Sequence, residues 1–207
     1  MSNWYERHVL PYLIDFACGI KPVRRQREKV VPLAQGRVLE IGIGTGLNLP
    51  HYDKTKVHAI VGVDPALEMH RLARKRMRTA GLAVELVGLS AERVPFEDAS
   101  FDTVLVTYTL CSIPDPLAAL KEARRLLKRD GRLVFCEHGA APDASVRRWQ
   151  QRLNPLWSRL AGGCHLDRDI PALLASAGLE SPDLQTAYLP GPRPLTYHYW
   201  GTAVRTL

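Results

Sequence analysis

Cysteine is scarce in this sequence, and its four copies are not spaced as metal sites or disulfide frameworks usually are. Cys18, Cys111, Cys136 and Cys164 include no CxxC pair, and their neighbours are mostly apolar. This spacing argues against a zinc site and against a disulfide scaffold. We therefore expect reduced thiols, no bound metal and a cytoplasmic location.

The apolar stretch near the N-terminus is too short to cross a membrane. Residues 9–20 are mostly apolar, but a spanning helix needs about 20 apolar residues, and Pro11 and Asp15 interrupt this one. No basic segment and cleavage site precede it, as a secretion signal requires. We expect a soluble protein without a membrane anchor.

Acidic residues are outnumbered by basic ones, which gives a net charge of +7. Most of the excess lies in residues 21–29, 71–78 and 121–129, where basic and apolar residues alternate at helical spacing. We interpret these clusters as solvated helix faces, and a surface for nucleic acid or anionic lipid is the alternative. The length of 207 residues and the apolar fraction of 46% suit a single domain.

Short apolar strands alternate with amphipathic helices through the middle of the chain. Strands are expected at 37–43, 58–64, 83–90, 101–110 and 131–139. One helix is expected directly after Asp64, and another after Asp115, ending where Gly131 adopts the left-handed conformation. This alternation indicates an α/β fold with a Rossmann-like, doubly wound, mostly parallel sheet covered on both faces.

The C-terminal part departs from this alternation. A helix over 167–179 precedes two strands, 183–189 and 196–205, whose Pro/Gly-rich connection predicts an antiparallel hairpin at a sheet edge. We divide the single domain, residues 1–207, into four segments. They are an N-terminal lid (1–30), a ligand-binding core (31–139), an insertion (140–166) and a C-terminal helix and hairpin (167–207).

Three glycines follow the first strand in the stretch VLEIGIGTGLN, residues 38–48. Gly42, Gly44 and Gly46 allow a tight turn and a close approach of the backbone to a ligand. A phosphate-binding loop would continue with a lysine and a hydroxyl residue, and a dinucleotide site would have a glycine instead of Leu47. The carboxylate of Glu40, just before the loop, would repel a pyrophosphate but favour a cation.

The second expected strand ends in Asp64. A carboxylate there can accept hydrogen bonds from both hydroxyls of a ribose, and capping the helix that begins at Pro65 is the alternative role. The loop and the two acids together predict a ligand with a ribose, a positive centre and no diphosphate. S-adenosylmethionine meets this description, with S-adenosylhomocysteine as the product of methyl transfer.

Four ordered stretches resemble the successive motifs of class I S-adenosylmethionine-dependent methyltransferases. They are LEIGIGTG (39–46), VGVDPALEM (61–69), SAERVPFEDASFDTVLVTYTL (90–110) and EARRLLKRDGRLVF (122–135). The resemblance implies a seven-stranded sheet whose last strand, in the C-terminal hairpin, is antiparallel. It also implies that the glycine loop cradles the methionine part of the cofactor and that Asp64 binds the ribose.

The same resemblance assigns the rest of the cofactor pocket. Thr107 would lie under the sulfonium, and the adenine would contact Pro65, Ala91 and Glu92. Ser90 stands where many relatives have an aspartate that bonds the adenine amino group, so that contact would rely on the backbone or on the Ser90 hydroxyl.

Stretches outside the core resemble a narrower group, methyltransferase-like proteins that methylate small alkyl thiols. They are LCSI (110–113), EHG (137–139), WQQ (149–151) and GCHLDRD (163–169). This resemblance makes a small, apolar alkyl thiol the leading acceptor, and a quinone precursor or a lipid is the alternative. The hydrophobic N-terminal anchor of the animal members is not expected here.

Methyl transfer is an in-line displacement for which the protein supplies alignment and desolvation. A thiol acceptor needs little more than deprotonation, whereas a hydroxyl or carbon acid needs a positioned base. Candidates for catalysis are His138 after the fifth strand, His165 in the insertion and Tyr5 in the lid. An ordinary structural role is the alternative for each of them.

Two rival functions remain open. Enzymes that methylate base amino groups usually carry an Asn/Asp-Pro-Pro-aromatic motif after the fourth strand, and residues 107–110 read TYTL. That difference argues against amino methylation of bases, although not against every RNA. A non-catalytic protein that binds S-adenosylmethionine is the second rival, and the intact glycines and acids argue against it. The acceptor and the oligomeric state are left open.

Overall fold

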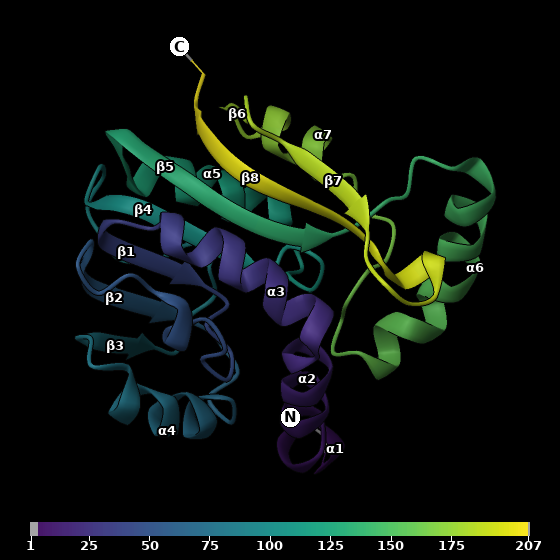
Figure 1. The fold of residues 1–207 in the computed structure, drawn as a ribbon, viewed down its shortest axis with the longest axis horizontal. Helices are drawn as coiled ribbons and strands as arrows, with labels where there is room; N and C mark the ends of the chain where they lie inside the picture. The colour runs from purple at the N-terminus through teal and green to yellow at the C-terminus, as the bar shows by residue number, and fades with distance from the viewer. Residues whose placement is uncertain (1–3, 207) are drawn as a thin grey trace.

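The computed structural model describes residues 4–206, which form a mixed sheet with helices on both faces (Figure 1). The strands lie in the order β3-β2-β1-β4-β5-β8-β6, and β7 pairs with β8. The strand bounds are β1 Gly36–Ile41, β2 Val57–Val63, β3 Val84–Val87, β4 Phe101–Thr107, β5 Leu127–His138, β6 Leu179–Glu180, β7 Gln185–Tyr188 and β8 Tyr197–Arg205. The pairs among β1 to β5 are parallel, and β8 is antiparallel to β5. The expected Rossmann-like fold is confirmed, with one short strand, β6, beyond the expected seven.

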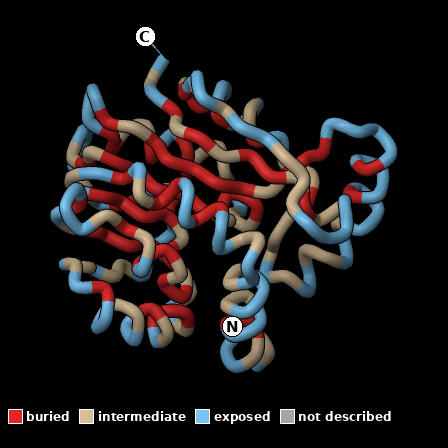
Figure 2. Tube along the Cα trace, in the orientation of Figure 1, coloured by how far each residue is buried: buried red, intermediate tan, exposed pale blue. Residues whose placement is uncertain are grey.

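Helices cover both faces of the sheet. Val30, at the end of α3 (Lys21–Val30), packs in the core of one face, where Figure 1 shows α3 crossing the strands. Two helices, α5 (Pro116–Leu126) and α7 (Ile170–Ser176), pack in the core of the opposite face. The central strands are buried along most of their length (Figure 2), as their near-continuous apolar sequences require.

Local capping explains where two of these helices begin. Asp115 Oδ1 accepts a hydrogen bond from the Ala118 N–H at the start of α5, and Asp169 Oδ1 accepts one from the Ala172 N–H at the start of α7. In both helices a proline follows near the cap, where its missing N–H costs nothing. Gly178 then ends α7 with φ 72°, the left-handed conformation that suits glycine.

Two of the predicted helix boundaries were wrong. The helix after Asp64 begins only at His70 and runs as α4, His70–Ala80, because the Asp64 carboxylate holds the Ala66 N–H in a turn at 2.9 Å. The helix before Gly131 ends at Leu126, so this glycine lies within β5 and its φ is not positive. Gly131 is needed for space instead, since a Cβ there would lie 3.0 Å from the Asp102 carbonyl oxygen.

The first two helices and the insertion lie beyond one end of the sheet. Two helices, α1 (Trp4–His8) and α2 (Leu10–Gly19), lead into α3, and α6 (Ala144–Leu160) stands opposite them in Figure 1. The Tyr5 hydroxyl donates a hydrogen bond to the Leu160 carbonyl oxygen at 3.0 Å, which joins α1 to the end of α6. None of the helices within residues 4–206 has the length and apolar character needed to cross a bilayer.

Candidate cofactor site and its buried surroundings

The glycine loop follows β1 and places three residues in the left-handed region. Gly42, Gly44 and Gly46 have φ values of 70°, 51° and 79°. A Cβ on Gly42 would lie 2.2 Å from the Thr109 side chain, so packing requires that glycine. A Cβ on Gly44 would meet no atom closer than 3.8 Å, because Gly44 faces open space. The middle glycine therefore leaves room that the rest of the fold does not fill.

That room is part of a cavity of about 270 Å³ at the carboxyl ends of the parallel strands, the edge where open α/β sheets bind ligands. The glycine loop, the turn after β2 and the segment after β4 form its floor. Ile14 of α2 and Gly162, just after α6, line it from the appended segments. Further lining residues include Cys18, Arg27, Asp64, Ser90, Ala91, Thr107, Tyr108 and Ser112.

Asp64 links the end of β2 to the glycine loop. Its Oδ2 accepts a hydrogen bond from the Gly44 N–H at 2.9 Å, and its Oδ1 accepts one from the Ala66 N–H. Burial raises the pKa of this carboxyl, although the two backbone hydrogen bonds act in the opposite direction. Each oxygen keeps a lone pair, so the carboxylate can still accept hydrogen bonds from a ligand in the cavity.

A buried polar network lies behind the loop. Glu40 accepts hydrogen bonds from the Asn48 amide at 2.8 Å and from the Tyr52 hydroxyl at 2.7 Å. Burial raises the pKa of Glu40 to about 7, against the lowering effect of these two donors. Asn48 also donates to Thr107 Oγ1 at 2.9 Å, so the network reaches the end of β4 and fixes the wall of the cavity.

Arg27 is a buried cation in the cavity wall that the sequence analysis missed. Its Nη1 donates to Asn48 Oδ1 and to Thr107 Oγ1, both at 2.6 Å, and its guanidinium lies 4.9 Å from the centre of the Tyr108 ring. Its side chain is 5% exposed, and within residues 4–206 its buried Nε has no hydrogen-bond partner. The sequence predicts a solvated face for the basic cluster 21–29, because a mixed amphipathic helix gives no signal for the one arginine that turns inward.

Tyr108 carries a second unusual feature of the cavity wall. Its φ is 54°, in the left-handed region that a bulky aromatic residue rarely adopts. Its N–H donates to the Cys136 carbonyl oxygen at 2.9 Å, and the Cys136 thiol donates to its hydroxyl at 3.4 Å. Strained residues of this kind often mark functional sites.

The residues expected to bind the cofactor fall into two groups. The structure places six of them in the lining of the cavity: Gly42, Gly44, Asp64, Pro65, Ala91 and Thr107. Glu40, Gly46 and Glu92 lie outside the lining. Glu40 belongs to the network behind the loop, and Glu92 accepts hydrogen bonds from the Ser90 hydroxyl and the Asp115 N–H.

The three candidates for catalysis also lie outside this lining. His138 Nε2 lies 3.1 Å from Cys164 Sγ, and His165 Nδ1 lies 3.1 Å from Asn154 Nδ2. Tyr5 is held at the end of α6 by its hydrogen bond to Leu160. His138 nevertheless lies near the cavity. It is in a cluster with Cys111, and the next residue in the sequence, Ser112, lines the cavity.

Comparisons with known proteins agree with this geometry. Residues 39–135 match a family model described as a methyltransferase domain. The chain is 31% identical to a phosphatidylethanolamine N-methyltransferase of Cereibacter sphaeroides over 92% of each chain. It is 32% identical to the thiol S-methyltransferase TMT1B of Rattus norvegicus, over 81% of this chain and 70% of that one. A crystal structure of an S-adenosylmethionine-dependent methyltransferase of Thermotoga maritima superposes with a TM-score of 0.64 at 26% identity, covering 96% of this chain and 97% of that one.

Proposed function

Because this chain belongs to the class I S-adenosylmethionine-dependent methyltransferases, we propose that it transfers the methyl group to the sulfur of a small, apolar thiol. The observation that carries the choice of acceptor is the absence of a free base among the described residues that line the cavity. The likeness to a thiol S-methyltransferase supports the same choice.

The cavity fits the cofactor through two features of the chain itself. Gly44 leaves a space that a Cβ would occupy, next to the Asp64 carboxylate that would accept hydrogen bonds from the ribose hydroxyls. On the other side, the guanidinium of Arg27, a lining residue, would attract the carboxylate of the methionine part. The bound cofactor supplies an electrophilic methyl group, and the chain supplies its orientation and the exclusion of water.

The ionisable side chains in the described lining are Cys18, Arg27, Asp64 and Tyr108. Burial holds the pKa of the Tyr108 hydroxyl well above 10 and raises the pKa of the Cys18 thiol, so both keep their protons at neutral pH. The remaining lone pairs of Asp64 are assigned to the ribose hydroxyls of the cofactor, and Arg27 is a cation. An acceptor in this cavity therefore has to supply most of its own nucleophilicity.

A thiol does so far better than an alcohol, because thiols ionise much more readily and are intrinsically strong nucleophiles; the thiol of cysteine, with a reference pKa of about 8.5, is already a few per cent thiolate at pH 7. An alcohol or a carbon acid would need a base that the described lining does not offer. The three residues expected to act in catalysis, His138, His165 and Tyr5, would then serve the shape of the site rather than proton transfer.

A lipid amine is the second candidate acceptor. It is favoured by the similarity to the phosphatidylethanolamine enzyme, and by apolar side chains exposed on the appended helices. Phe16 of α2 and Leu156 of α6 are 76% and 62% exposed. Exposed apolar side chains on these two helices would suit a lipid surface.

The test is the formation of S-adenosylhomocysteine by purified protein with four acceptors assayed separately. They are an alkanethiol, vesicles containing phosphatidylethanolamine, a phenolic quinone precursor and bulk RNA, with Asp64→Ala as the background control. We expect turnover with the thiol, at a rate that rises with pH up to the pKa of the thiol itself. In a series of thiols with different pKa values, the midpoint of that rise should shift with the pKa of the thiol used. A midpoint that stays fixed would indicate a protein base, and turnover with vesicles alone would favour the lipid amine.

A further inference from the structure

Three side chains with metal-ligating atoms meet beside the cavity. Cys111 Sγ, a ring nitrogen of His138 and Cys164 Sγ all lie within 4.8 Å of one another. Cys111 follows β4, His138 ends β5, and Cys164 follows α6, so the fold joins three segments that are far apart in the sequence. Cysteine spacing predicted no metal site, because spacing along the chain cannot report a cluster that only the sheet assembles.

The dimensions of the cluster suit a tetrahedral ion. With Zn–S bonds of about 2.3 Å and Zn–N bonds of about 2.0–2.1 Å, neighbouring ligand atoms lie roughly 3.6–3.8 Å apart. His138 Nε2 and Cys164 Sγ are 3.1 Å apart, and the whole triangle stays below 4.8 Å. Changes of at most about 1 Å in the separations of the three atoms would bring them to one metal.

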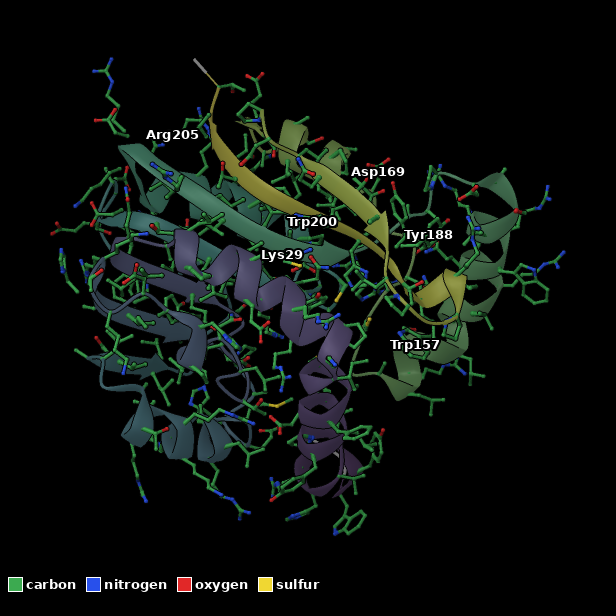
Figure 3. All side chains as sticks on the ribbon, in the orientation of Figure 1. Lys29, Trp157, Asp169, Tyr188, Trp200 and Arg205 are labelled. Carbon is green, nitrogen blue, oxygen red and sulfur yellow. The ribbon has the colours of Figure 1, made fainter. Side chains whose placement is uncertain are left out.

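The surroundings of the two sulfur atoms also suit coordinated thiolates. The Trp157 Nε1–H of α6, labelled in Figure 3, donates to Cys164 Sγ at 3.3 Å. Ser112 Oγ lies 3.5 Å from Cys111 Sγ. Hydrogen bonds to the ligand atoms are the outer contacts that tune and orient metal ligands. Two thiolates and a neutral imidazole would balance the charge of a divalent ion, which a largely buried site requires.

We propose that Cys111, His138 and Cys164 bind a thiophilic divalent metal ion, Zn²⁺, in a site adjacent to the cofactor cavity. Two thiolates and an imidazole select zinc over the hard cations, which prefer oxygen ligands. Cys111 is buried, while His138 and Cys164 are half-buried, so the ion has a side from which to enter. Three protein ligands leave one tetrahedral position for a water or an external thiol.

A metal bound at this site would connect separate parts of the fold. It would tie the loop after α6, and with it Gly162 in the cavity lining, to the ends of β4 and β5. The metal would therefore hold the insertion against the sheet. This inference does not depend on which acceptor the enzyme methylates.

The experiment uses untagged full-length protein, because a polyhistidine tag binds metal itself. Metal content is measured by mass spectrometry after gel filtration in chelator-free buffer, and we expect about one zinc per chain, as a single site of this type would hold. Protein stripped and reloaded with Co²⁺ should show a thiolate-to-cobalt charge-transfer band and the intense visible bands of tetrahedral Co²⁺. Added Zn²⁺ should raise the melting temperature of the stripped protein.

Matched variants test whether the metal is bound by this cluster or by other cysteines of the chain. Cys164→Ser and His138→Gln should each lower the zinc content to a small fraction and abolish the charge-transfer band. Cys136→Ser removes a buried thiol outside the cluster and should keep both signals. Stoichiometric metal in the cluster variants, or no metal and no cobalt spectrum in the wild type, would overturn the proposal. A Cys111–Cys164 disulfide in freshly purified, metal-free protein would overturn it as well. All these readouts are independent of methyl transfer, so the proposed function and this site fail separately.

Discussion

Asp15, on the N-terminal helix α2, accepts a hydrogen bond from the hydroxyl of Thr45, in the middle of the glycine loop, across 2.6 Å. The same Oδ1 pairs with Arg76 of α4 at 2.8 Å, and Arg76 also donates to the Thr45 carbonyl oxygen at 2.7 Å. The appended helix is therefore bonded directly to the loop that forms the floor of the cavity. Movement of α2 and occupation of the cavity should be coupled.

Replacing Asp15 tests that coupling. Asp15→Ala removes the contacts to Thr45 and Arg76, and hydrogen bonds to charged groups contribute about 1.5–3 kcal/mol each. Because part of this energy orders the glycine loop, we expect S-adenosylhomocysteine affinity, measured by calorimetry, to fall by about tenfold. Asp15→Asn keeps an acceptor for Thr45, so its affinity should lie between those of the wild type and Asp15→Ala. Equal affinities in all three proteins would show that α2 does not order the loop.

Two glycines of the loop should respond differently to the same substitution. Gly44→Ala puts a methyl group into the open cavity, so it should abolish cofactor binding and cost only the left-handed strain of about 1–2 kcal/mol in stability. Gly42→Ala would place its Cβ 2.2 Å from Thr109 and should lower stability more. The measurements are cofactor affinity by calorimetry and the free energy of unfolding in urea. A Gly44→Ala protein that binds the cofactor normally would contradict the placement of the site.

Arg27 offers a test that separates binding from folding. Because its guanidinium is the proposed partner of the methionine carboxylate, Arg27→Met should weaken S-adenosylhomocysteine binding by about 10- to 100-fold, as expected for a lost charge-assisted interaction. Binding of 5′-methylthioadenosine, which has no carboxylate, should change much less. The ratio of the two affinities is therefore the readout, and a general loss of structure would lower both equally. An unchanged ratio would assign Arg27 to the buried network alone.

The sequence was informative where the signal is local. The glycine loop and Asp64 could be placed because tight turns and strand ends impose residue types at fixed spacing. The inward turn of Arg27 could not be predicted, because it depends on how α3 crosses the sheet. The same holds for the meeting of Cys111 and Cys164, which requires the order of the strands and the path of the insertion. The late start of α4 reflects a competition within one turn, in which the Asp64 carboxylate binds the Ala66 N–H before a helix can form.

Glu40 should make the stability of the protein depend on pH. Burial raises the pKa of its carboxyl from 4.5 to about 7, whereas in the unfolded chain the pKa is ordinary. Between these two values the folded protein binds a proton that the unfolded chain has released. The free energy of unfolding therefore falls as the pH rises through this window, by up to about 1.4 kcal/mol per pH unit and about 3 kcal/mol in total. Above pH 7 the contribution is constant.

Glu40→Gln removes this titration while keeping the shape of the side chain. The measurement is urea unfolding of both proteins at several pH values from 4.5 to 8. Altering the hydrogen bonds to Asn48 and Tyr52 changes the stability of the variant by an amount that does not depend on pH. On top of that constant difference, we expect the variant to gain stability relative to the wild type steadily as the pH rises to 7. A difference that stays constant across the window would mean that Glu40 is ionised in the folded protein throughout. The network around Arg27 would then stabilise the negative charge of Glu40. The site behind the glycine loop would hold an ionised carboxylate, with its negative electrostatic potential, instead of a neutral, protonated carboxyl.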